Sequence, residues 1–215
     1  PVAAAAPAGV SPDTWRLQPL PGGGVAEGTV DGRVVVRRDA AATEVAGLAG
    51  GQVQSMAVSP DGTRLAVAST GSGATVIDLA SLEPRPLPAL HPEAHVRAAF
   101  DVAWLDDRRL AVAEPNVGVV LHEPGARQAR VLHRADFAWT LAVLGPRRLL
   151  VGTGDGGLVE LDPVSGAVRR RLGGHDRGVS AIATTPDGRR LITADDAGAV
   201  VVRDRRDGRS LLRLG

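Results

Sequence analysis

Short apolar runs recur along the chain, each followed by a turn, an arginine or two, a leucine and a second apolar run. This order is clearest at residues 53–70, 100–115, 139–154 and 179–195. The leucines that begin the second run are spaced by 45, 39 and 42 residues, and they are Leu65, Leu110, Leu149 and Leu191. Apolar runs this short, bounded by Gly, Pro and Asp, predict pairs of β-strands joined by tight turns.

A third and a fourth strand complete each repeat. Third strands are predicted at residues 74–79, 118–123, 158–163 and 199–204, and fourth strands are clearest at 167–172 and 209–214. A more divergent copy covers residues 14–50, where 28–39 parallels 195–204. Four strands in about 40 residues is the period of a propeller blade.

We therefore predict an all-β fold, a β-propeller of about five four-stranded antiparallel blades. The predicted blades are residues 13–50, 51–90, 91–133, 134–173 and 174–215, after a linker of Pro and Ala at 1–12. Five blades could close on themselves or belong to a larger ring, and no blade mixes strands from both ends of the chain. Because the last predicted blade finishes at residues 214–215, where a following repeat would begin, a segment of a larger ring is favoured over a closed five-bladed ring.

Composition supports many short strands and excludes some chemistry. Hydrophobic residues make up 44% of the chain and aromatic residues only 2%, and 27 Gly and 15 Pro provide the turns. The net charge is +1 and every basic residue is Arg, so almost nothing titrates between His and Arg and the high isoelectric point follows. A nucleic-acid partner is therefore not expected. The absence of Cys excludes disulfides and thiolate sites.

No apolar stretch is long enough to span a bilayer, so membrane insertion is not expected. The expected location is cytoplasmic, although an exported domain would have a similar composition.

In the last repeat, residues 173–204, Gly174-His175 precedes the first strand, Pro186-Asp187-Gly188 forms the first turn, and Asp204 ends the third strand. With these features the repeat resembles the bacterial WD-repeat family, in which a Gly-His pair stands at the position of Gly174-His175. Asp78 and Asp162 end the third strand of two other repeats. No repeat has the Trp-Asp dipeptide, since the Trp position holds Ile77, Leu161 or Arg203. The resemblance implies a propeller, with about seven blades common in such rings.

In WD repeats a His, a Ser or Thr, an Asp and the Trp form a hydrogen-bonded network. The resemblance therefore implies structural roles for five residues, which are Asp78, Asp155, Asp162, His175 and Asp204. We expect the network to be incomplete in every blade. Asp155 has no His in register, and the turn position that matches His175 holds Ala197.

No catalytic, cofactor-binding or metal-binding residue is predicted. His91 and His95 are spaced like a metal pair but flank a loop after Pro92. Asp106-Asp107, Asp195-Asp196 and the glycine-rich segment 152–157 are best explained as turns. Arginines recur in the turn between the first two strands, and a solvated rim is the favoured interpretation of Arg64, Arg108, Arg109, Arg147, Arg148, Arg189 and Arg190. Trp104 is expected in the core between blades.

The function implied by the resemblance is a non-enzymatic scaffold that binds a protein or peptide, in a larger bacterial signalling or regulatory protein. Binding could require further blades from the parent chain. The loops that commonly bind partners select Arg97, Asn116, Phe137 and Arg177. The alternative is a quinoprotein-like or lactonase-like propeller with a cofactor or metal at its central funnel, because residues 154–170 resemble a quinoprotein repeat.

Overall fold

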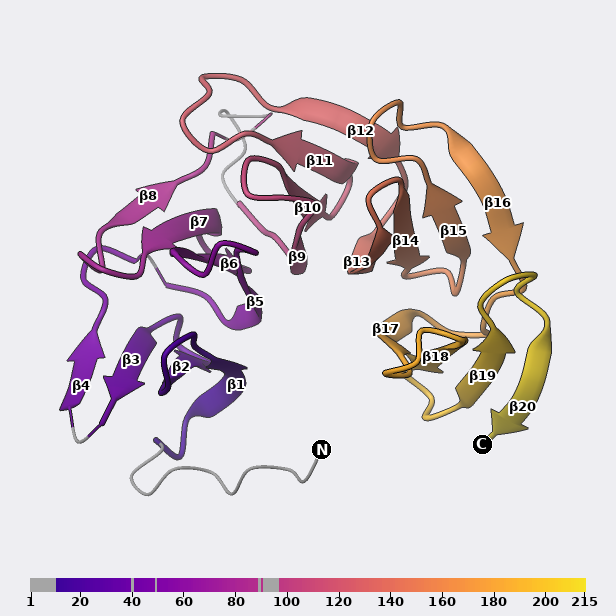
Figure 1. Ribbon diagram of the computed structural model, residues 1–215, viewed down its shortest axis with the longest axis horizontal. Coiled ribbons are helices and arrows are strands. Elements are labelled where there is room, and N and C mark those ends of the chain that lie inside the picture. Colours follow the sequence, from indigo (N-terminus) through magenta and orange to yellow (C-terminus); the bar gives the residue numbers. More distant parts are fainter. Residues whose placement is uncertain (1–10, 40, 49, 89, 91–96) are drawn as a thin grey trace.

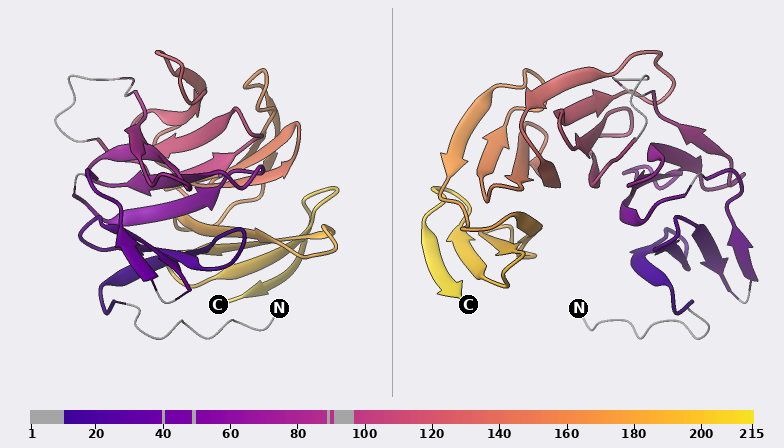
Figure 2. Two further views of the ribbon diagram at one scale, coloured as in Figure 1. Left: turned by 60° about the vertical axis from the view of Figure 1, so that its left-hand side comes forward. Right: turned by 180° about the vertical axis from the view of Figure 1, so that it is seen from behind.

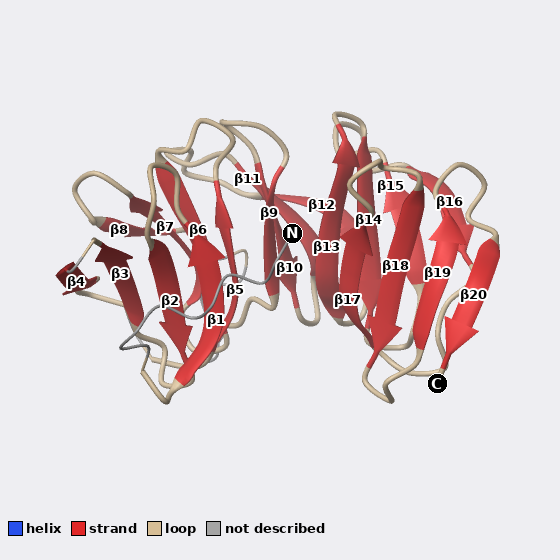
Figure 3. Cartoon of the chain, turned by 60° about the horizontal axis from the view of Figure 1, so that its bottom comes forward, coloured by secondary structure: helices blue, strands red, loops and turns tan. Residues whose placement is uncertain are grey.

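The computed structural model describes residues 11–39, 41–48, 50–88, 90 and 97–215. In this part of the chain every regular element is a β-strand, numbered β1 to β20, and the strands form five four-stranded sheets (Figure 3). Each strand pairs antiparallel with the next one along the chain within its sheet. The predicted all-β propeller of five four-stranded antiparallel blades is confirmed.

The blades follow one another along the sequence. Blade 1 comprises β1 (Thr14–Pro19), β2 (Val25–Thr29), β3 (Val34–Arg38) and β4 (Ala41–Glu44). Blade 2 comprises β5 (Val53–Val58), β6 (Arg64–Ser69), β7 (Gly73–Asp78) and β8 (Pro84–Pro86). Blade 3 comprises β9 (Asp101–Trp104), β10 (Leu110–Glu114), β11 (Gly118–His122) and β12 (Arg130–Arg134). Blade 4 comprises β13 (Ala138–Gly145), β14 (Arg148–Thr153), β15 (Leu158–Leu161) and β16 (Val168–Leu172). Blade 5 comprises β17 (Val179–Thr184), β18 (Arg190–Asp195), β19 (Val200–Asp204) and β20 (Ser210–Leu214).

The five blades stand side by side around a common axis and form an open arc (Figures 1 and 2). The first strand of each blade lies on the inner side of the arc and the fourth strand lies on the outer side (Figure 1). Blade 1 stands at one end of the arc and blade 5 at the other. Each of these two blades therefore has one face that no other described blade covers.

The core lies between neighbouring blades. We call the face of a blade toward the preceding blade its leading face, and the face toward the following blade its trailing face. Successive strand residues point to opposite faces, so one strand supplies both. The four repeated leucines lie on leading faces and are at most 1% exposed, and they are Leu65, Leu110, Leu149 and Leu191. Between blades 2 and 3 the residues that face them from the preceding blade are small, and they include Ala66, Ala68 and Ala74.

Trp104 is in that core, as predicted. Its side chain is 7% exposed and packs with residues of blades 2 and 3, and its indole N–H donates to the Ala57 carbonyl at 3.0 Å. The bond satisfies the polar atom of a buried tryptophan.

Candidate partner-binding surface

Antiparallel strands return the chain alternately to two rims of the arc. The proximal rim consists of the loops before each first strand and the turns between the second and third strands. The distal rim consists of the other turns within the blades. The structure places all four predicted partner-binding residues on the proximal rim, where all are exposed, and they are Arg97, Asn116, Phe137 and Arg177.

These four residues come from three consecutive blades. Arg97 precedes β9 and forms a parallel bridge with Ser72 of blade 2, and Asn116 lies in the turn between β10 and β11. Phe137 immediately precedes β13, and Arg177 precedes β17. The proximal rim therefore presents two cations, an amide and an aromatic ring along blades 3 to 5.

Phe137 combines exposure with an unusual backbone conformation. Its side chain is 47% exposed, and its φ is 54°, a left-handed value that is rare for a bulky residue. The Phe137 carbonyl accepts a hydrogen bond from the Gly154 N–H at 2.8 Å, which ties the loop to the neighbouring turn of the same blade. Backbone strain of this kind occurs at binding sites, where the surrounding structure maintains it.

Trp139 and Phe100 form a half-buried aromatic pair close to Phe137, because both Phe137 and Trp139 lie beside Gly154. The rings of Phe100 and Trp139 meet edge to face, with centroids 6.3 Å apart and planes at 69°. The indole nitrogen of Trp139 is buried and has no hydrogen-bond partner among the described residues. A Cβ at Gly178 would lie 2.4 Å from the Trp139 ring, so glycine is required where blade 5 approaches blade 4.

His175 belongs to a buried hydrogen-bonded triad at the contact between blades 4 and 5. Its Nδ1 lies 3.1 Å from Asp195 Oδ2 and its Nε2 lies 2.8 Å from Thr193 Oγ1. The arrangement that satisfies all three side chains has Nδ1–H donating to the carboxylate and the Thr193 hydroxyl donating to Nε2. The His175 backbone N–H also donates to the Gly156 carbonyl of blade 4 at 2.9 Å.

This triad corrects the sequence-based expectation that the last blade lacks the acidic member of the network, although the network still lacks its Trp. The acid is Asp195, the last residue of β18, and not a residue at the turn position of Ala197. Asp195 also accepts the backbone N–H groups of Ala197 and Ala199 at 3.0 and 2.9 Å, so the predicted turn role is correct but partial. Burial raises the pKa of Asp195, but these bonds and His175 outweigh it and hold the pKa below its usual value. Compared with the WD-repeat network, only the Trp position of this blade differs, since it holds Arg203, a buried residue that is 4% exposed.

The three aspartates that end third strands each cap the following turn on the distal rim. Asp78 Oδ1 accepts the backbone N–H groups of Ala80 and Ser81 at 2.9 Å, and Asp162 Oδ1 accepts that of Val164 at 2.9 Å. Asp204 Oδ1 accepts a backbone N–H two residues further on at 2.7 Å. The same side-chain geometry thus recurs in three blades.

Asp155 lies on the proximal rim, and it stabilises a turn between the second and third strands of its blade. It bonds to the Thr153 hydroxyl and accepts the Gly157 N–H at 3.2 Å, in the turn between β14 and β15. Thr29 and Asp31 make the equivalent contact in blade 1.

Some of the repeated arginines do not point into solvent, contrary to the prediction of a solvated rim. Arg108, Arg189 and Arg190 are exposed, as predicted, but the prediction is wrong for Arg64 and Arg148. Arg64 stacks on Trp104 at 4.9 Å and bonds to the backbone carbonyl of Asp107, so it joins blade 2 to blade 3. These arginines fasten neighbouring blades together.

Arg148 is part of a charged cluster between blades 4 and 5 that the sequence did not reveal. Glu160, whose side chain is 3% exposed, accepts Arg148 Nε at 2.5 Å and Arg170 Nε at 2.7 Å. Arg170 also donates to the backbone carbonyls of Arg205 and Arg206 in blade 5, at 2.8 and 2.9 Å. The only signal in the sequence is the run Arg169-Arg170-Arg171 in β16, whose side chains alternate between the two faces of the strand.

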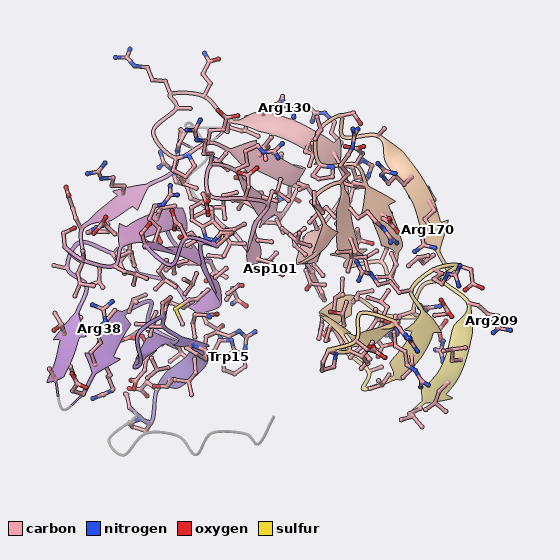
Figure 4. All side chains as sticks on the ribbon, in the orientation of Figure 1. Trp15, Arg38, Asp101, Arg130, Arg170 and Arg209 are labelled. Carbon is pink, nitrogen blue, oxygen red and sulfur yellow. The ribbon has the colours of Figure 1, made fainter. Side chains whose placement is uncertain are left out.

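Asp101 is a second residue that the sequence analysis missed. It lies on the inner side of the arc at the start of β9 (Figure 4). Its Oδ2 accepts the Leu141 N–H at 2.7 Å and the Thr140 hydroxyl at 3.1 Å, so it joins blade 3 to blade 4. Burial raises the pKa of Asp101, against the hydrogen bonds from Ser55 and Leu141. Its role in this geometry is to bind blades together at the axis.

The described side chains contain no group of three or more His, Asp or Glu residues placed to hold a metal ion. The described part of the chain has no helix long and apolar enough to cross a membrane. His91 and His95 lie outside the described residues.

The fold and the His175 triad define a WD-type β-propeller, and comparisons with known proteins support this class. A family model described as "Lipoprotein LpqB beta-propeller domain" matches residues 21–174, and one described as "WD domain, G-beta repeat" matches residues 166–204. Because the first match covers well over half of the chain, the chain belongs to the LpqB lipoprotein β-propeller domain family. A search of curated proteins found no match.

Solved structures show the same fold at low sequence identity. The β-propeller domain of Cps50 (Swd1) from Myceliophteria thermophila is 16% identical with a TM-score of 0.71, and the match covers 92% of this chain and 67% of that one. The C-terminal WD40 domain of Sif2 is 15% identical with a TM-score of 0.73, covering 94% of this chain and 57% of that one. The chain thus spans between about half and two thirds of these similar chains.

Proposed function

We propose that the chain is a non-enzymatic protein-interaction scaffold that binds a protein or peptide on its proximal rim, between blades 3 and 5. The observation that carries this proposal is Phe137, an exposed aromatic side chain with a left-handed backbone, close to Trp139 of the Phe100–Trp139 pair. Aromatic residues with arginines beside them dominate the binding energy of protein interfaces. The WD-type fold supports the same class of function.

The proximal rim offers one aromatic contact, two cationic contacts and one amide contact to a partner. Phe137 would insert into an apolar pocket of the partner, while Arg97 and Arg177 at either side would pair with carboxylates. Asn116, with a φ of 65°, presents an amide from the turn between β10 and β11. The proposed partner is therefore a protein or extended peptide with an apolar anchor residue flanked by acidic residues, acting in a larger signalling or regulatory protein.

Replacing Phe137 should weaken partner binding without affecting the fold. We expect Phe137→Ala to reduce affinity by roughly thirtyfold, the effect of losing about 2 kcal/mol at an interface hot spot. The free energy of unfolding should change by less than about 0.5 kcal/mol, because the ring is nearly half exposed in the free protein. Affinity capture followed by calorimetry with the purified partner measures the first quantity, and urea denaturation measures the second.

Val164→Ala is the matched control, since Val164 is also 47% exposed but lies in a turn on the distal rim. It should leave the affinity unchanged. A partner bound equally well by wild type and Phe137→Ala, or lost in Val164→Ala, would contradict the proposed surface.

The location expected from the sequence, the cytoplasm, stays a prediction. The description of the matching family, a lipoprotein domain, favours an exported protein instead. Fractionation of cells that produce the parent protein, with detection of this domain outside the cytoplasmic fraction, would decide for export.

A further inference from the structure

The distal rim of blades 4 and 5 carries a concentration of positive charge. We call its four turns, with the residues beside them, the basic patch, and they are residues 145–148, 162–169, 185–190 and 204–209. The patch contains eight arginines and four aspartates, a net charge of +4 in a chain whose total is +1. Glu160 and Arg170, which pair with each other beside these turns, leave the sum unchanged.

The four aspartates of the basic patch are bonded to the backbone of their own turns. Each accepts a backbone N–H two residues further on, at 2.7 to 3.0 Å, and they are Asp162, Asp187, Asp204 and Asp207. Arg189, Arg206 and Arg209 are exposed, and none of them forms an ion pair with a carboxylate of the described residues. The side chain of Arg209 projects outward from blade 5 (Figure 4). The patch therefore presents free guanidinium groups to solvent.

The exposure of these arginines does not depend on whether another blade follows blade 5. Arg189 has the position in blade 5 that Arg147 has in blade 4, two residues before the repeated leucine. The Arg147 side chain is 63% exposed although blade 5 packs against blade 4. Val164 corresponds to Arg206, since each follows a strand-ending aspartate by two residues, and Val164 is 47% exposed beside blade 5. A further blade would therefore leave the distal turns of blade 5 in solvent.

The composition of the basic patch favours a surface of phosphate groups over a nucleic acid or an acidic protein. The patch contains no aromatic residue, whereas base stacking and protein hot spots rely largely on aromatic side chains. The described residues form no helix that could enter a major groove. Guanidinium groups bind phosphate through paired hydrogen bonds. The exposed Val164 adds an apolar side chain, which suits the boundary between lipid headgroups and acyl chains.

We propose that the basic patch docks the chain on a membrane surface rich in anionic phospholipid. The free arginines of blades 4 and 5 bind the lipid phosphates. The proximal rim lies at the opposite ends of the same strands, so it faces away from the membrane and stays open to a protein partner. Each basic residue near an anionic surface raises the affinity roughly fivefold, so a net charge of +4 gives weak and reversible docking.

Co-sedimentation with lipid vesicles tests the proposal on the complete chain. We expect binding to vesicles made of equal parts of phosphatidylglycerol and phosphatidylcholine, and almost none to vesicles of phosphatidylcholine alone. Binding should be present at about 0.1 M NaCl and lost at about 1 M, because the Debye length falls from about 10 to about 3 Å.

Charge reversal within the basic patch should weaken this binding. Arg206→Glu changes the charge by two units, so the affinity for the anionic vesicles should fall roughly 25-fold. Arg209→Glu should have the same effect, which guards against a local disturbance by either substitution. Arg134→Glu is the matched control, because Arg134 is exposed at the end of β12 that points to the proximal rim. It should bind within about twofold of wild type, and unchanged melting temperatures would show that all three variants fold.

Three outcomes would overturn the proposal. The first is equal binding of wild type to both kinds of vesicle, and the second is undiminished binding of Arg206→Glu and Arg209→Glu or an equal loss in Arg134→Glu. The third is tighter binding to duplex DNA or to polyglutamate than to the anionic vesicles, which would assign the basic patch to a nucleic acid or to an acidic protein.

Discussion

Glu160→Ala should destabilise the chain by about 3 kcal/mol. The substitution removes the carboxylate that joins Arg148 and Arg170 and leaves the two guanidinium groups facing each other between blades 4 and 5. Breaking a buried ion pair by removing one partner costs about 3–5 kcal/mol. The lower value applies because the two arginine side chains are 34% and 24% exposed and remain partly solvated.

Unfolding of the Glu160→Ala variant should begin in blade 5, because Arg170 also donates hydrogen bonds to the backbone carbonyls of Arg205 and Arg206. Repeat proteins unfold locally when one interface weakens. Hydrogen exchange should therefore accelerate in β17–β20 before it does in blades 1 to 3, and urea denaturation should give the total loss. Glu83→Ala is the control, because Glu83 pairs with Arg85 on the surface, at 63% and 75% exposure, and should cost less than about 1 kcal/mol. Equal effects of the two substitutions would contradict the assigned role of Glu160.

Low pH should weaken the contact of Glu160 with Arg148 and Arg170. Burial raises the pKa of Glu160, but the bonds from Arg148 and Arg170 outweigh it, so the pKa lies below its usual value near 4.5. A carboxyl group with a depressed pKa in the folded state stabilises the protein above its unfolded pKa, and this stabilisation is lost as the pH falls through the folded pKa. Wild type should therefore lose stability below about pH 4.5. Glu160→Gln should have a flatter profile there, which urea denaturation at a series of pH values would measure.

His175→Ala should also cost about 3 kcal/mol. The His175 and Asp195 side chains are at most 1% exposed, so the substitution leaves a buried carboxylate, the Thr193 hydroxyl and a cavity without the ring. An unsatisfied buried polar group costs about 1–3 kcal/mol, and the lost packing adds to it. Thermal unfolding monitored by circular dichroism should show the melting temperature lowered by roughly 6–12 °C.

His133→Ala provides the comparison, because His133 is a half-buried side chain of β12 outside the triad. It should cost less than about 1 kcal/mol. Asp195→Asn combined with His175→Ala should be less than additive, since both changes remove the same hydrogen bond. Full additivity, or a His133 effect as large as that of His175, would show that the triad does not stabilise the contact between blades.

The sequence predicted the blades because their signal is local. A strand alternates its side chains over a few residues, and Leu65, Leu110, Leu149 and Leu191 mark the same register in four copies. The caps at Asp78 and Asp162 are local as well, since each bonds to backbone within three residues. Period and turn chemistry therefore suffice for the fold class.

Side-chain contacts between different strands and between blades could not be predicted in the same way. Glu160 meets arginines 12 and 10 residues away in sequence, and Asp101 meets Leu141, 40 residues away. Their pairing depends on which face each strand turns toward its neighbour. For the same reason the acidic partner of His175 is Asp195, two residues before the predicted turn position that Ala197 occupies.

The most direct test of the account is site-specific photo-crosslinking in cells that produce the parent protein. A photoreactive amino acid would replace Phe137 on the proximal rim or Val164 on the distal rim, two positions of equal exposure. The account predicts one predominant cross-linked protein at position 137 and none at position 164. Cross-linking of the same protein at position 164, or no protein product at position 137 in a folded chain, would contradict a partner-binding scaffold built on the proximal rim.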